Sequence, residues 1–479
     1  MSDLQNINAN SLPSGRIADI ARRGRVSVLG FGISNRPLVD ILLRLEAQVT
    51  VYDQKDVAVL GDEAAQMQAR GARFTTSLAD ALSPAPDLIF RTPGIRPDHP
   101  DIVAAVRGGA ELSSEMAWFL EITPATVFAI TGSDGKTTTS TLTAKMLEAA
   151  GKTVYLGGNI GRPLLPLVAD MTKDDFAVVE LSSFQLFDLP SLAVPHRAAL
   201  TNLTPNHLNW HVDMEEYTLA KTRIYKGGRC RRLVTNADNA ITSLLAENAK
   251  AEREVLLFSS SPDENEKTSD GIRLINGVIT LCKQETFLPL LATEDILLPG
   301  RHNVENYMTA IGLVYDIVPA SAIRAVATTF GGVEHRLEVV RVHRGATYYN
   351  SSIDSTPTRT AAAISALSCP MVLICGGYDK HIDFAPLADA LCARAHAVVL
   401  TGATADKIHK AILACPLYDS GKLTVVREPD FECAVHTAVD LARPGDAVLL
   451  SPACASFDAF PNFEVRGRTF KRIVTELQE

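Results

Sequence analysis

The eight cysteines of the sequence include no Cys-x-x-Cys pair, and most of them stand inside apolar runs. This spacing excludes the usual structural zinc sites and redox pairs, so we expect buried and reduced thiols. No apolar run is long enough to cross a bilayer, and the first fifteen residues lack an apolar stretch after a basic start. We therefore expect a cytoplasmic protein without a signal peptide and without membrane insertion.

Positive charge is also scarce, because 46 lysines and arginines face 55 aspartates and glutamates, a formal net charge of −9. Such a chain offers no broad basic surface, so we expect no nucleic-acid partner. There is no internal repeat and no low-complexity tract. What the 479 residues do contain is a hydrophobic fraction of 46%, which suffices for about three domains with cores of their own.

Short apolar runs alternate with helical stretches along the whole sequence, a pattern typical of α/β folds with mainly parallel sheets. We expect a Rossmann-like N-terminal domain over residues 1–114 and a central domain over 115–332. The central domain resembles a phosphate-loop ATPase and is built on a parallel sheet. A second Rossmann-like domain follows over 333–479. The polar segment 258–271 predicts a surface excursion before a β-hairpin over 271–282.

The most informative segment, Ala129-Ile-Thr-Gly-Ser-Asp-Gly-Lys-Thr-Thr138, follows an apolar strand and opens a helix. Glycines let backbone N–H groups surround phosphate oxygens, and the helix N-terminus adds partial positive charge. Lys136 is then expected to meet the β- and γ-phosphates, and the Thr137 hydroxyl to ligate Mg²⁺. The loop is shortened, since Ile130 stands where the usual pattern begins with glycine. The alternative is a helix-capping turn with a solvated lysine. The expected ATP-binding residues here are Gly132, Ser133, Asp134, Gly135, Lys136, Thr137 and Thr138.

A second glycine turn, Gly30-Phe-Gly-Ile-Ser-Asn35, follows the strand Val-Ser-Val-Leu. It begins like a dinucleotide fingerprint, but Asn35 replaces the third glycine. Asp53 ends the next strand, about 20 residues on, where an acidic group can bind a ribose hydroxyl. The segment favours a nucleotide-diphosphate pocket, and a tight turn without any ligand remains an alternative.

Further motifs follow in a fixed order. They are Gly-Asn-Ile-Gly at 158–161, FAVVELSSFQL, LTNLTPNHLNWH, LPGRHNVENYMTAI, CGGYDK and SPACASFDAFPNFEVRG. Together with the phosphate loop they resemble the ATP-dependent Mur ligases of peptidoglycan synthesis over nearly the whole chain, and the last motif is similar to that of the D-glutamate-adding member.

The resemblance implies an enzyme that uses ATP and Mg²⁺ to join D-glutamate to UDP-N-acetylmuramoyl-L-alanine through an acyl phosphate. It assigns UDP binding to the N-terminal domain, ATP binding to the central domain and amino-acid binding to the C-terminal domain. Two alternatives stay open. One is a related Mur or folylpolyglutamate-type ligase with another amino acid, and the other is a catalytically silent nucleotide-binding regulator. We expect a monomer.

A carboxylate that attacks a polyanionic phosphate needs cations between the two, and Lys136 with two Mg²⁺ ions would meet that need. The resemblance implies that Lys136, Glu180, His207 and Lys221 are catalytic, and that Thr137, Glu180, His207 and a carbamylated Lys221 hold metal. Lys221 shares a helix face with Tyr217 and Ile224, where burial lowers the pKa of an amine and lets it react with CO₂. The alternative is a lysine whose ammonium reaches water.

The remaining site residues are also implied by the resemblance. For ATP they are Asn303, Asn306 and Arg336; for the UDP substrate Gly30, Ile33, Ser34, Asp53, Gly94, Asn159 and Ser182; for D-glutamate Ser355, Lys380, Ser456, Phe457 and Phe463. The chain departs from the family pattern at 351–355, where Ser351, Ile353 and Ser355 replace an aspartate, a lysine and a threonine. Asp354 and Arg359 are candidates to supply the missing charges.

Overall fold

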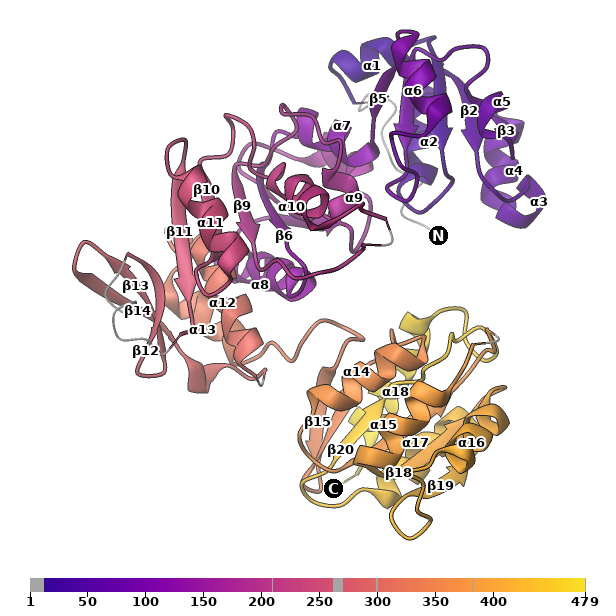
Figure 1. Ribbon diagram of the computed structural model, residues 1–479, viewed down its shortest axis with the longest axis vertical. Coiled ribbons are helices and arrows are strands. Elements are labelled where there is room, and N and C mark those ends of the chain that lie inside the picture. The colour runs from indigo at the N-terminus through magenta and orange to yellow at the C-terminus, as the bar shows by residue number, and fades with distance from the viewer. Residues whose placement is uncertain (1–12, 209, 262–269, 299, 381, 479) are drawn as a thin grey trace. The chain divides into compact units, whose positions relative to one another are not determined.

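The computed structural model describes residues 13–208, 210–261, 270–298, 300–380 and 382–478 (Figure 1). It divides into two compact units, Met1–Thr329 and Phe330–Glu479. The first unit contains two sheets and the second contains one. The predicted α/β fold class is confirmed, whereas the three-domain division with boundaries after 114 and 332 stays a prediction.

The N-terminal sheet is parallel and has the strand order β3-β2-β1-β4-β5. Val26 and Val28 belong to the core that includes α2, whereas Leu29 lies in a second small core with Ile89 and Ile102. The sheet is therefore covered on both faces, and its strand order reverses between β1 and β4. The elements are α1 (Arg16–Ala21), β1 (Arg25–Leu29), α2 (Asn35–Arg44), β2 (Gln48–Tyr52), α3 (Val57–Leu60), α4 (Asp62–Ala69), β3 (Arg73–Thr75), α5 (Leu78–Ala81), β4 (Leu88–Arg91), α6 (Pro100–Arg107) and β5 (Glu111–Ser113).

The central sheet has nine strands in the order β14-β13-β12-β11-β10-β9-β6-β8-β7. Strands β11, β10, β9, β6, β8 and β7 pair in parallel in that order. At the other edge, β12, β13 and β14 form antiparallel pairs. This confirms the predicted hairpin, while residues 262–269 of the polar segment before it lie outside the described residues. The strands are β6 (Thr126–Thr131), β7 (Val154–Gly158), β8 (Phe176–Glu180), β9 (Arg197–Leu200), β10 (Arg232–Asn236), β11 (Glu254–Ser259), β12 (Gly271–Ile275), β13 (Val278–Lys283) and β14 (Thr286–Ala292).

Helices flank this sheet (Figure 1). Helix α8 makes its helix–helix contacts mainly with α12 and α13, and α9 contacts α10. Their bounds are α7 (Glu115–Ile122), α8 (Lys136–Ala149), η1 (Leu165–Asp170), α9 (Ser183–Leu186), α10 (Met214–Thr222), α11 (Ala240–Ala249), η2 (Thr293–Asp295), α12 (Arg301–Val314) and α13 (Ala320–Ala327).

The second unit has a six-stranded sheet in the order β15-β16-β20-β17-β18-β19, in which only the β15–β16 pair is antiparallel. Its central strands are apolar: β17 and β20 are fully buried, and β18 is buried at every residue except His396. Its elements are β15 (Glu338–His343), β16 (Ala346–Asn350), α14 (Pro357–Ala366), β17 (Met371–Gly376), α15 (Ala385–Arg394), β18 (Ala395–Thr401), α16 (Ala405–Ala414), β19 (Thr424–Arg427), α17 (Phe431–Leu441), β20 (Ala447–Leu450) and α18 (Phe463–Glu476).

All eight cysteines are free thiols, as the sequence predicted. Five are buried, while Cys369 and Cys392 are half-buried and Cys433 is exposed. Within the part of the chain that the structure describes, no helix combines the length and the apolar character that crossing a membrane requires.

Candidate active site

The phosphate loop connects β6 to α8 at the carboxyl edge of the central sheet. Gly132 has φ +148° and Gly135 has φ +77°, and a Cβ at either position would collide with a side-chain oxygen, Thr201 Oγ1 or Asn306 Oδ1. Glycine is therefore required at both positions by conformation and by space. Lys136 is the first residue of α8, and its Nζ donates to the Ser133 carbonyl oxygen at 2.9 Å. The predicted strand, loop and helix are confirmed.

A buried carboxylate lies beside this loop. Glu180 ends β8, is 1% exposed, and accepts hydrogen bonds from Thr137 Oγ1 at 2.8 Å and from Asn159 Nδ2 at 2.9 Å. A hydroxyl and a carboxylate are ligands of the kind that Mg²⁺ prefers, and Mg²⁺ sites commonly use one or two protein carboxylates beside substrate phosphates. The donor set at Thr137 and Glu180 thus fits Mg²⁺.

Lys221 reaches the same loop from α10. Its side chain is 2% exposed, and Nζ donates to Gly132 O at 2.8 Å and to Thr131 Oγ1 at 3.1 Å. The ammonium also lies 4.9 Å from the centre of the Tyr217 ring. Burial, and secondarily the charge of Lys136, lowers the pKa of Lys221 well below its ordinary value. The burial predicted from the helix face is therefore confirmed, and the alternative of a lysine whose ammonium reaches water is excluded.

His207 lies in the connection between β9 and α10, with φ +56°, and it is exposed. Its ring contacts that of Phe184, with 4.8 Å between ring centres. Partial desolvation lowers the pKa of His207, and the nearby charges of Lys221 and Lys136 lower it further. Both effects favour the neutral imidazole, which is the form that binds a metal ion.

The two asparagines of α12 lie against the phosphate loop. Asn306 Nδ2 donates to Asn303 Oδ1 at 3.2 Å, and Thr139 Oγ1 donates to Asn306 Oδ1 at 3.3 Å. Asn306 also occupies the space above the Cα of Gly135. The nucleotide residues predicted for the central domain are therefore brought together. Arg336 belongs to the second unit, where it is exposed in the turn that precedes β15.

The N-terminal sheet has a cavity of about 360 Å³ at its point of strand-order reversal, which is where open α/β sheets place their ligands. Ile33 and Ser34, two of the residues predicted for the UDP substrate, line it together with Arg91, Glu115 and Gln185. Gln185 also bonds to Ser182, whose side chain caps α9. The cavity thus has walls from the turn after β1 and from helices that belong to the central part of the chain.

The turn after β1 closes without a third glycine because Asn35 Nδ2 donates to the Gly30 carbonyl oxygen at 2.8 Å. The Asp53 carboxylate accepts the N–H groups of Phe31 at 2.9 Å and of Lys55 at 3.1 Å. Asp53 thereby stabilises the turn. Gly30, Asp53 and Gly94 lie outside the set of residues that line the cavity.

Comparison with known proteins agrees with this geometry. The Mur ligase middle domain matches residues 130–314, and the Mur ligase glutamate ligase domain matches residues 335–454. The UDP-N-acetylmuramoylalanine–D-glutamate ligase of Clostridium novyi is 44% identical over 463 residues, which cover 96% of this chain and 98% of that protein. The protein of the same name from Acetivibrio thermocellus is 42% identical and covers 95% and 97%. The chain belongs to the Mur ligase family.

A solved structure agrees at the level of the fold. The UDP-N-acetylmuramate–alanine ligase of Thermotoga maritima matches with a TM-score of 0.52 at 18% identity, over 94% of this chain and 99% of that chain. The Mur ligase architecture of this chain is therefore shared with a structure that has little sequence in common with it.

In this Mur ligase, four of the predicted D-glutamate residues, Ser355, Lys380, Ser456 and Phe457, lie on loops of the second unit, and the fifth, Phe463, begins α18. The Tyr378 N–H donates to Ala455 O at 2.9 Å, which joins the loop of Lys380 to that of Ser456. Ser456 is buried, while Phe457 is 65% exposed and Lys380 is exposed. These loops are therefore adjacent, and Lys380 is exposed on one of them.

Arg466 is a residue of this region that the sequence analysis did not single out. Its buried guanidinium donates to Ser352 Oγ at 3.0 Å and to the Cys454 carbonyl oxygen at 3.1 Å. Ser352 Oγ in turn donates to the carbonyl oxygen of Phe463, the first residue of α18, at 2.8 Å. The signal in the sequence was the place of Arg466 in the motif FEVRG. An arginine in a buried helix turn needs several hydrogen-bond acceptors around it.

Residues 351–355 depart from the family pattern, and the structure shows the surroundings of the residues that replace it. Ser351 is buried, Ile353 and Ser355 are half-buried, and Asp354 accepts a hydrogen bond from Ser451 Oγ at 2.8 Å. Burial raises the pKa of Asp354, so this carboxyl is poorly placed to replace a ligand-binding aspartate. Arg359 is exposed and near the Ile353 carbonyl oxygen. The hypothesis of shifted charges is thus weaker for Asp354 than for Arg359.

Two further residues that line this cavity were missed by the sequence analysis. Glu115 is fully buried at the first turn of α7, its Oε1 accepts the Leu165 N–H at 3.1 Å, and desolvation raises its pKa to about 7. Arg91 is 2% exposed, and its Nε donates to Asp188 at 3.0 Å. Both were visible as charges that interrupt apolar runs, LSSEMAW and DLIFR.

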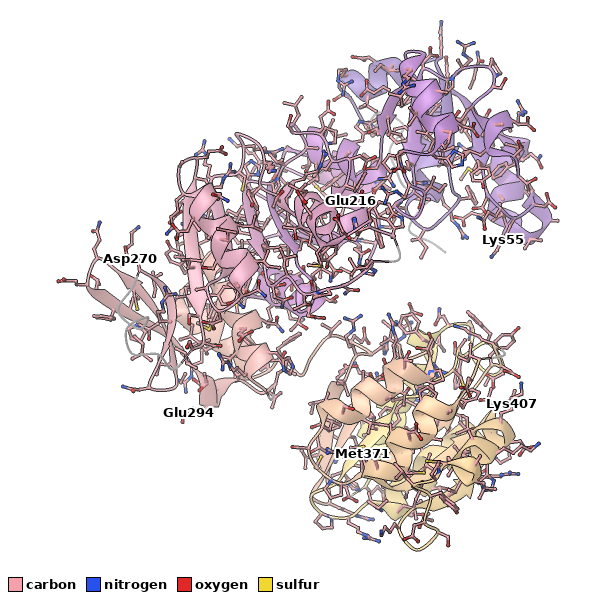
Figure 2. All side chains as sticks on the ribbon, in the orientation of Figure 1. Lys55, Glu216, Asp270, Glu294, Met371 and Lys407 are labelled. Carbon is pink, nitrogen blue, oxygen red and sulfur yellow. The ribbon has the colours of Figure 1, made fainter. Side chains whose placement is uncertain are left out.

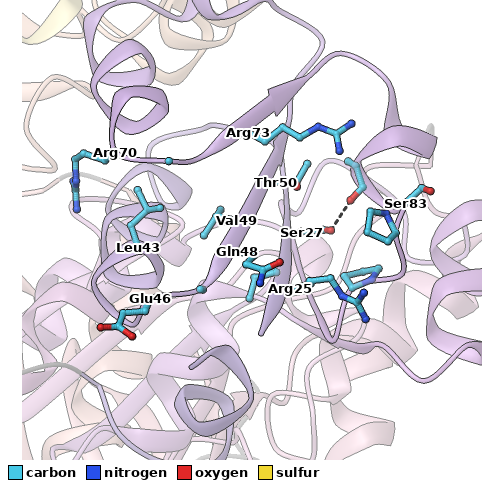
Figure 3. Close-up of a pocket in the computed structure, with 16 residues that line it drawn as sticks. Arg25, Ser27, Leu43, Glu46, Gln48, Val49, Thr50, Arg70, Arg73 and Ser83 are labelled. Atoms are coloured by element: carbon cyan, nitrogen blue, oxygen red, sulfur yellow. Dashed lines mark hydrogen bonds between the residues drawn. The ribbon is translucent and has the colours of Figure 1, made fainter. Parts of the chain in front are cut away.

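A second cavity of about 470 Å³ lies at the opposite edge of the N-terminal sheet (Figure 3). Arg25, Gln48 and Arg73, the first residues of β1, β2 and β3, line it, together with Ser83 and Pro84. None of the predicted site residues lies there. Ligands of α/β folds bind at the carboxyl ends of strands, so the smaller cavity is the better candidate.

Proposed function

We propose that this protein uses ATP to join D-glutamate to UDP-N-acetylmuramoyl-L-alanine in the synthesis of peptidoglycan precursors. The observation that carries the proposal is the convergence of Lys136, Thr137, Glu180 and Lys221 at one sheet edge. It occurs in a chain similar over nearly its whole length to proteins named for this reaction. The C-terminal motif around Ser456 supports D-glutamate as the amino acid.

ATP is proposed to bind the phosphate loop, with its phosphates at the N-terminus of α8 and Lys136 beside them. Asn303 and Asn306 are assigned to the adenine side, and Arg336 to the phosphates. Mg²⁺ would be held by Thr137 and Glu180, and a second ion by Glu180, His207 and a carbamylated Lys221. These ions supply neutralisation of the phosphate charge.

The chemistry begins when the carboxylate of the muramoyl-alanine substrate attacks the γ-phosphorus of ATP, so that ADP leaves and an acyl phosphate forms. The amine of D-glutamate then attacks the acyl carbon, loses a proton, and displaces phosphate to give the amide. Lys136 reduces the repulsion between the carboxylate and the phosphates. The low pKa of Lys221 favours the neutral amine that carbamylation requires.

The UDP substrate is proposed to bind at the carboxyl edge of the N-terminal sheet, and Asn159 and Ser182 to approach its muramoyl-alanine portion. The residues assigned to the UDP portion are Gly30, Ile33, Ser34, Asp53 and Gly94. D-Glutamate is assigned to the C-terminal loops with Ser355, Lys380, Ser456, Phe457 and Phe463. Every assigned residue comes from one chain, so we propose that a monomer is sufficient. Because the reaction consumes ATP, we place it in the cytoplasm.

The test supplies ATP, Mg²⁺ and UDP-N-acetylmuramoyl-L-alanine with a panel of D- and L-amino acids, and measures phosphate release and the mass of the product. Release with D-glutamate alone supports the proposal. Release with another amino acid or acceptor identifies a related ligase, and no release with any of them identifies a regulator. Substrate labelled with ¹⁸O in the carboxyl group transfers label to phosphate only if the acyl phosphate forms.

A further inference from the structure

Arg96 connects two segments that lie far apart in the sequence of the first unit. It follows β4 in the turn that leaves the UDP cavity, and its Nη1 and Nη2 donate to both carboxylate oxygens of Glu216 at 3.2 and 3.0 Å. Glu216 lies on the first turn of α10 and is labelled in Figure 2. A second carboxylate, that of Asp98, accepts from Arg96 Nε at 3.0 Å. The guanidinium is therefore held in a bidentate, charge-assisted network.

Two aromatic rings enclose the same guanidinium. Its carbon lies 4.7 Å from the ring centre of Trp210 and 5.2 Å from that of Phe187, and Nη1 donates to the Trp210 carbonyl oxygen. In return, Trp210 Nε1 donates to the carbonyl oxygen of Gly94 at 3.4 Å. Planar stacking of this kind is specific to arginine, because an ammonium offers neither the plane nor the paired donors.

The partners of Arg96 belong to the turn that carries His207. The N–H groups of Trp210 and His211 both donate to the His207 carbonyl oxygen at 3.0 Å. His211 then bonds to Ser183 Oγ at 2.9 Å and to Glu216 at 3.2 Å. The position of His207, at φ +56°, is thus set by a turn whose far end is fixed by Arg96 and Glu216.

We infer that Arg96 is a positioning residue that docks the substrate-binding turn Gly94–Arg96 against the His207 turn, so that substrate binding and the placement of His207 depend on one contact. The inference rests on the proposed function for its kinetic consequence. Its structural consequence, a fixed Trp210, can be measured without substrate, ATP or metal.

The first experiment uses Trp210 as a reporter in the full-length chain. The sequence has two tryptophans, so Trp118→Phe leaves Trp210 as the only indole. In this background, Arg96→Ala is expected to raise the acrylamide quenching constant of Trp210 and to shift its emission to the red, while Arg96→Lys gives an intermediate shift. Arg324→Ala, which removes an exposed ion pair with Asp295, is the matched control and leaves both values unchanged. Unchanged quenching in Arg96→Ala would overturn the inference.

The second experiment measures kinetics, after the wild-type chain has been shown to ligate D-glutamate. Arg96→Ala is expected to lower kcat/KM for the UDP substrate by about 10- to 100-fold, the range for a catalytic group displaced by about 1 Å, with the KM for ATP unchanged. Arg96→Lys regains part of this loss. In Arg96→Ala/Glu216→Ala the loss is smaller than the product of the two single losses, because both remove one contact.

The outcomes separate two failures. If the wild type does not ligate D-glutamate, the proposed function fails, and the quenching experiment still decides the docking role of Arg96. If the wild type is active and the losses of kcat/KM in Arg96→Ala and Glu216→Ala simply multiply in the double variant, Arg96 does not position His207. The same conclusion follows if the substitutions lower the melting temperature and leave kcat/KM unchanged. Glu216→Gln, which keeps the shape of the side chain, provides the same test if Arg96→Ala does not fold.

Discussion

Glu115→Gln is expected to stabilise the ligand-free protein at neutral and higher pH. The carboxyl of Glu115 is fully buried, and the one hydrogen bond it accepts, from the Leu165 N–H, only partly offsets the loss of water. Glutamine keeps the acceptor for Leu165 and has no charge to bury.

The size of the effect comes from the pKa of Glu115, about 7 in the folded chain against an ordinary 4.5. Below pH 4.5 the carboxyl is protonated in both the folded and the unfolded chain, so it does not lower the free energy of unfolding. Between the two values only the unfolded chain releases its proton, so the free energy of unfolding falls as pH rises. At 1.36 kcal/mol per pKa unit, the full cost above the folded pKa is about 3 kcal/mol.

The assay is urea denaturation of wild type and Glu115→Gln over a series of pH values that spans this window. The two free energies of unfolding are expected to coincide at its acid end and to diverge by about 3 kcal/mol at its alkaline end. Glu148→Gln, at an exposed position on α8, is the matched control and shows no such divergence. Parallel curves for wild type and Glu115→Gln across the whole window would refute the reasoning.

Three further outcomes are expected. Lys221→Ala abolishes phosphate release, and added short carboxylates restore part of it because they replace the carbamate; a fully active variant would contradict the role of Lys221. Gly132→Ala weakens ATP binding at least about tenfold in calorimetry, since the positive φ alone costs about 1–2 kcal/mol and the new Cβ meets Thr201; an unchanged Kd would contradict the loop geometry. Arg91→Ala leaves Asp188 unpaired and lowers the free energy of unfolding by about 3 kcal/mol, which an unchanged denaturation midpoint would rule out.

The phosphate loop was predictable because its strand, glycines, lysine and helix are adjacent in the sequence. Glu180 was predictable for a related reason, since parallel strands end at one edge and bring their last residues together. Asn35 shows the limit of pattern matching, because a side-chain hydrogen bond replaced the expected third glycine. The chain deviates from the motif there and still forms the turn.

Contacts between distant segments were not predictable. The partners of Glu115 and Arg96 lie 50 and 120 positions away along the chain, and no periodicity or spacing relates them. Burial determines the pKa of Glu115, and burial at a junction of two sheets depends on how the chain folds back on itself. The sequence showed only that a charge interrupts an apolar run, which is the mark of a charge with a specific partner.

The turn that follows β4 contributes to both halves of the proposed reaction. Thr92 and Pro93 line the cavity proposed for the UDP substrate, while Gly94 and Arg96 bond to Trp210 of the His207 turn. A ligand in this cavity would therefore contact a segment that is hydrogen-bonded to the turn of His207, a proposed metal ligand. Substitutions in the β4 turn are thus expected to change substrate binding and chemistry together, whereas substitutions in the phosphate loop change ATP binding.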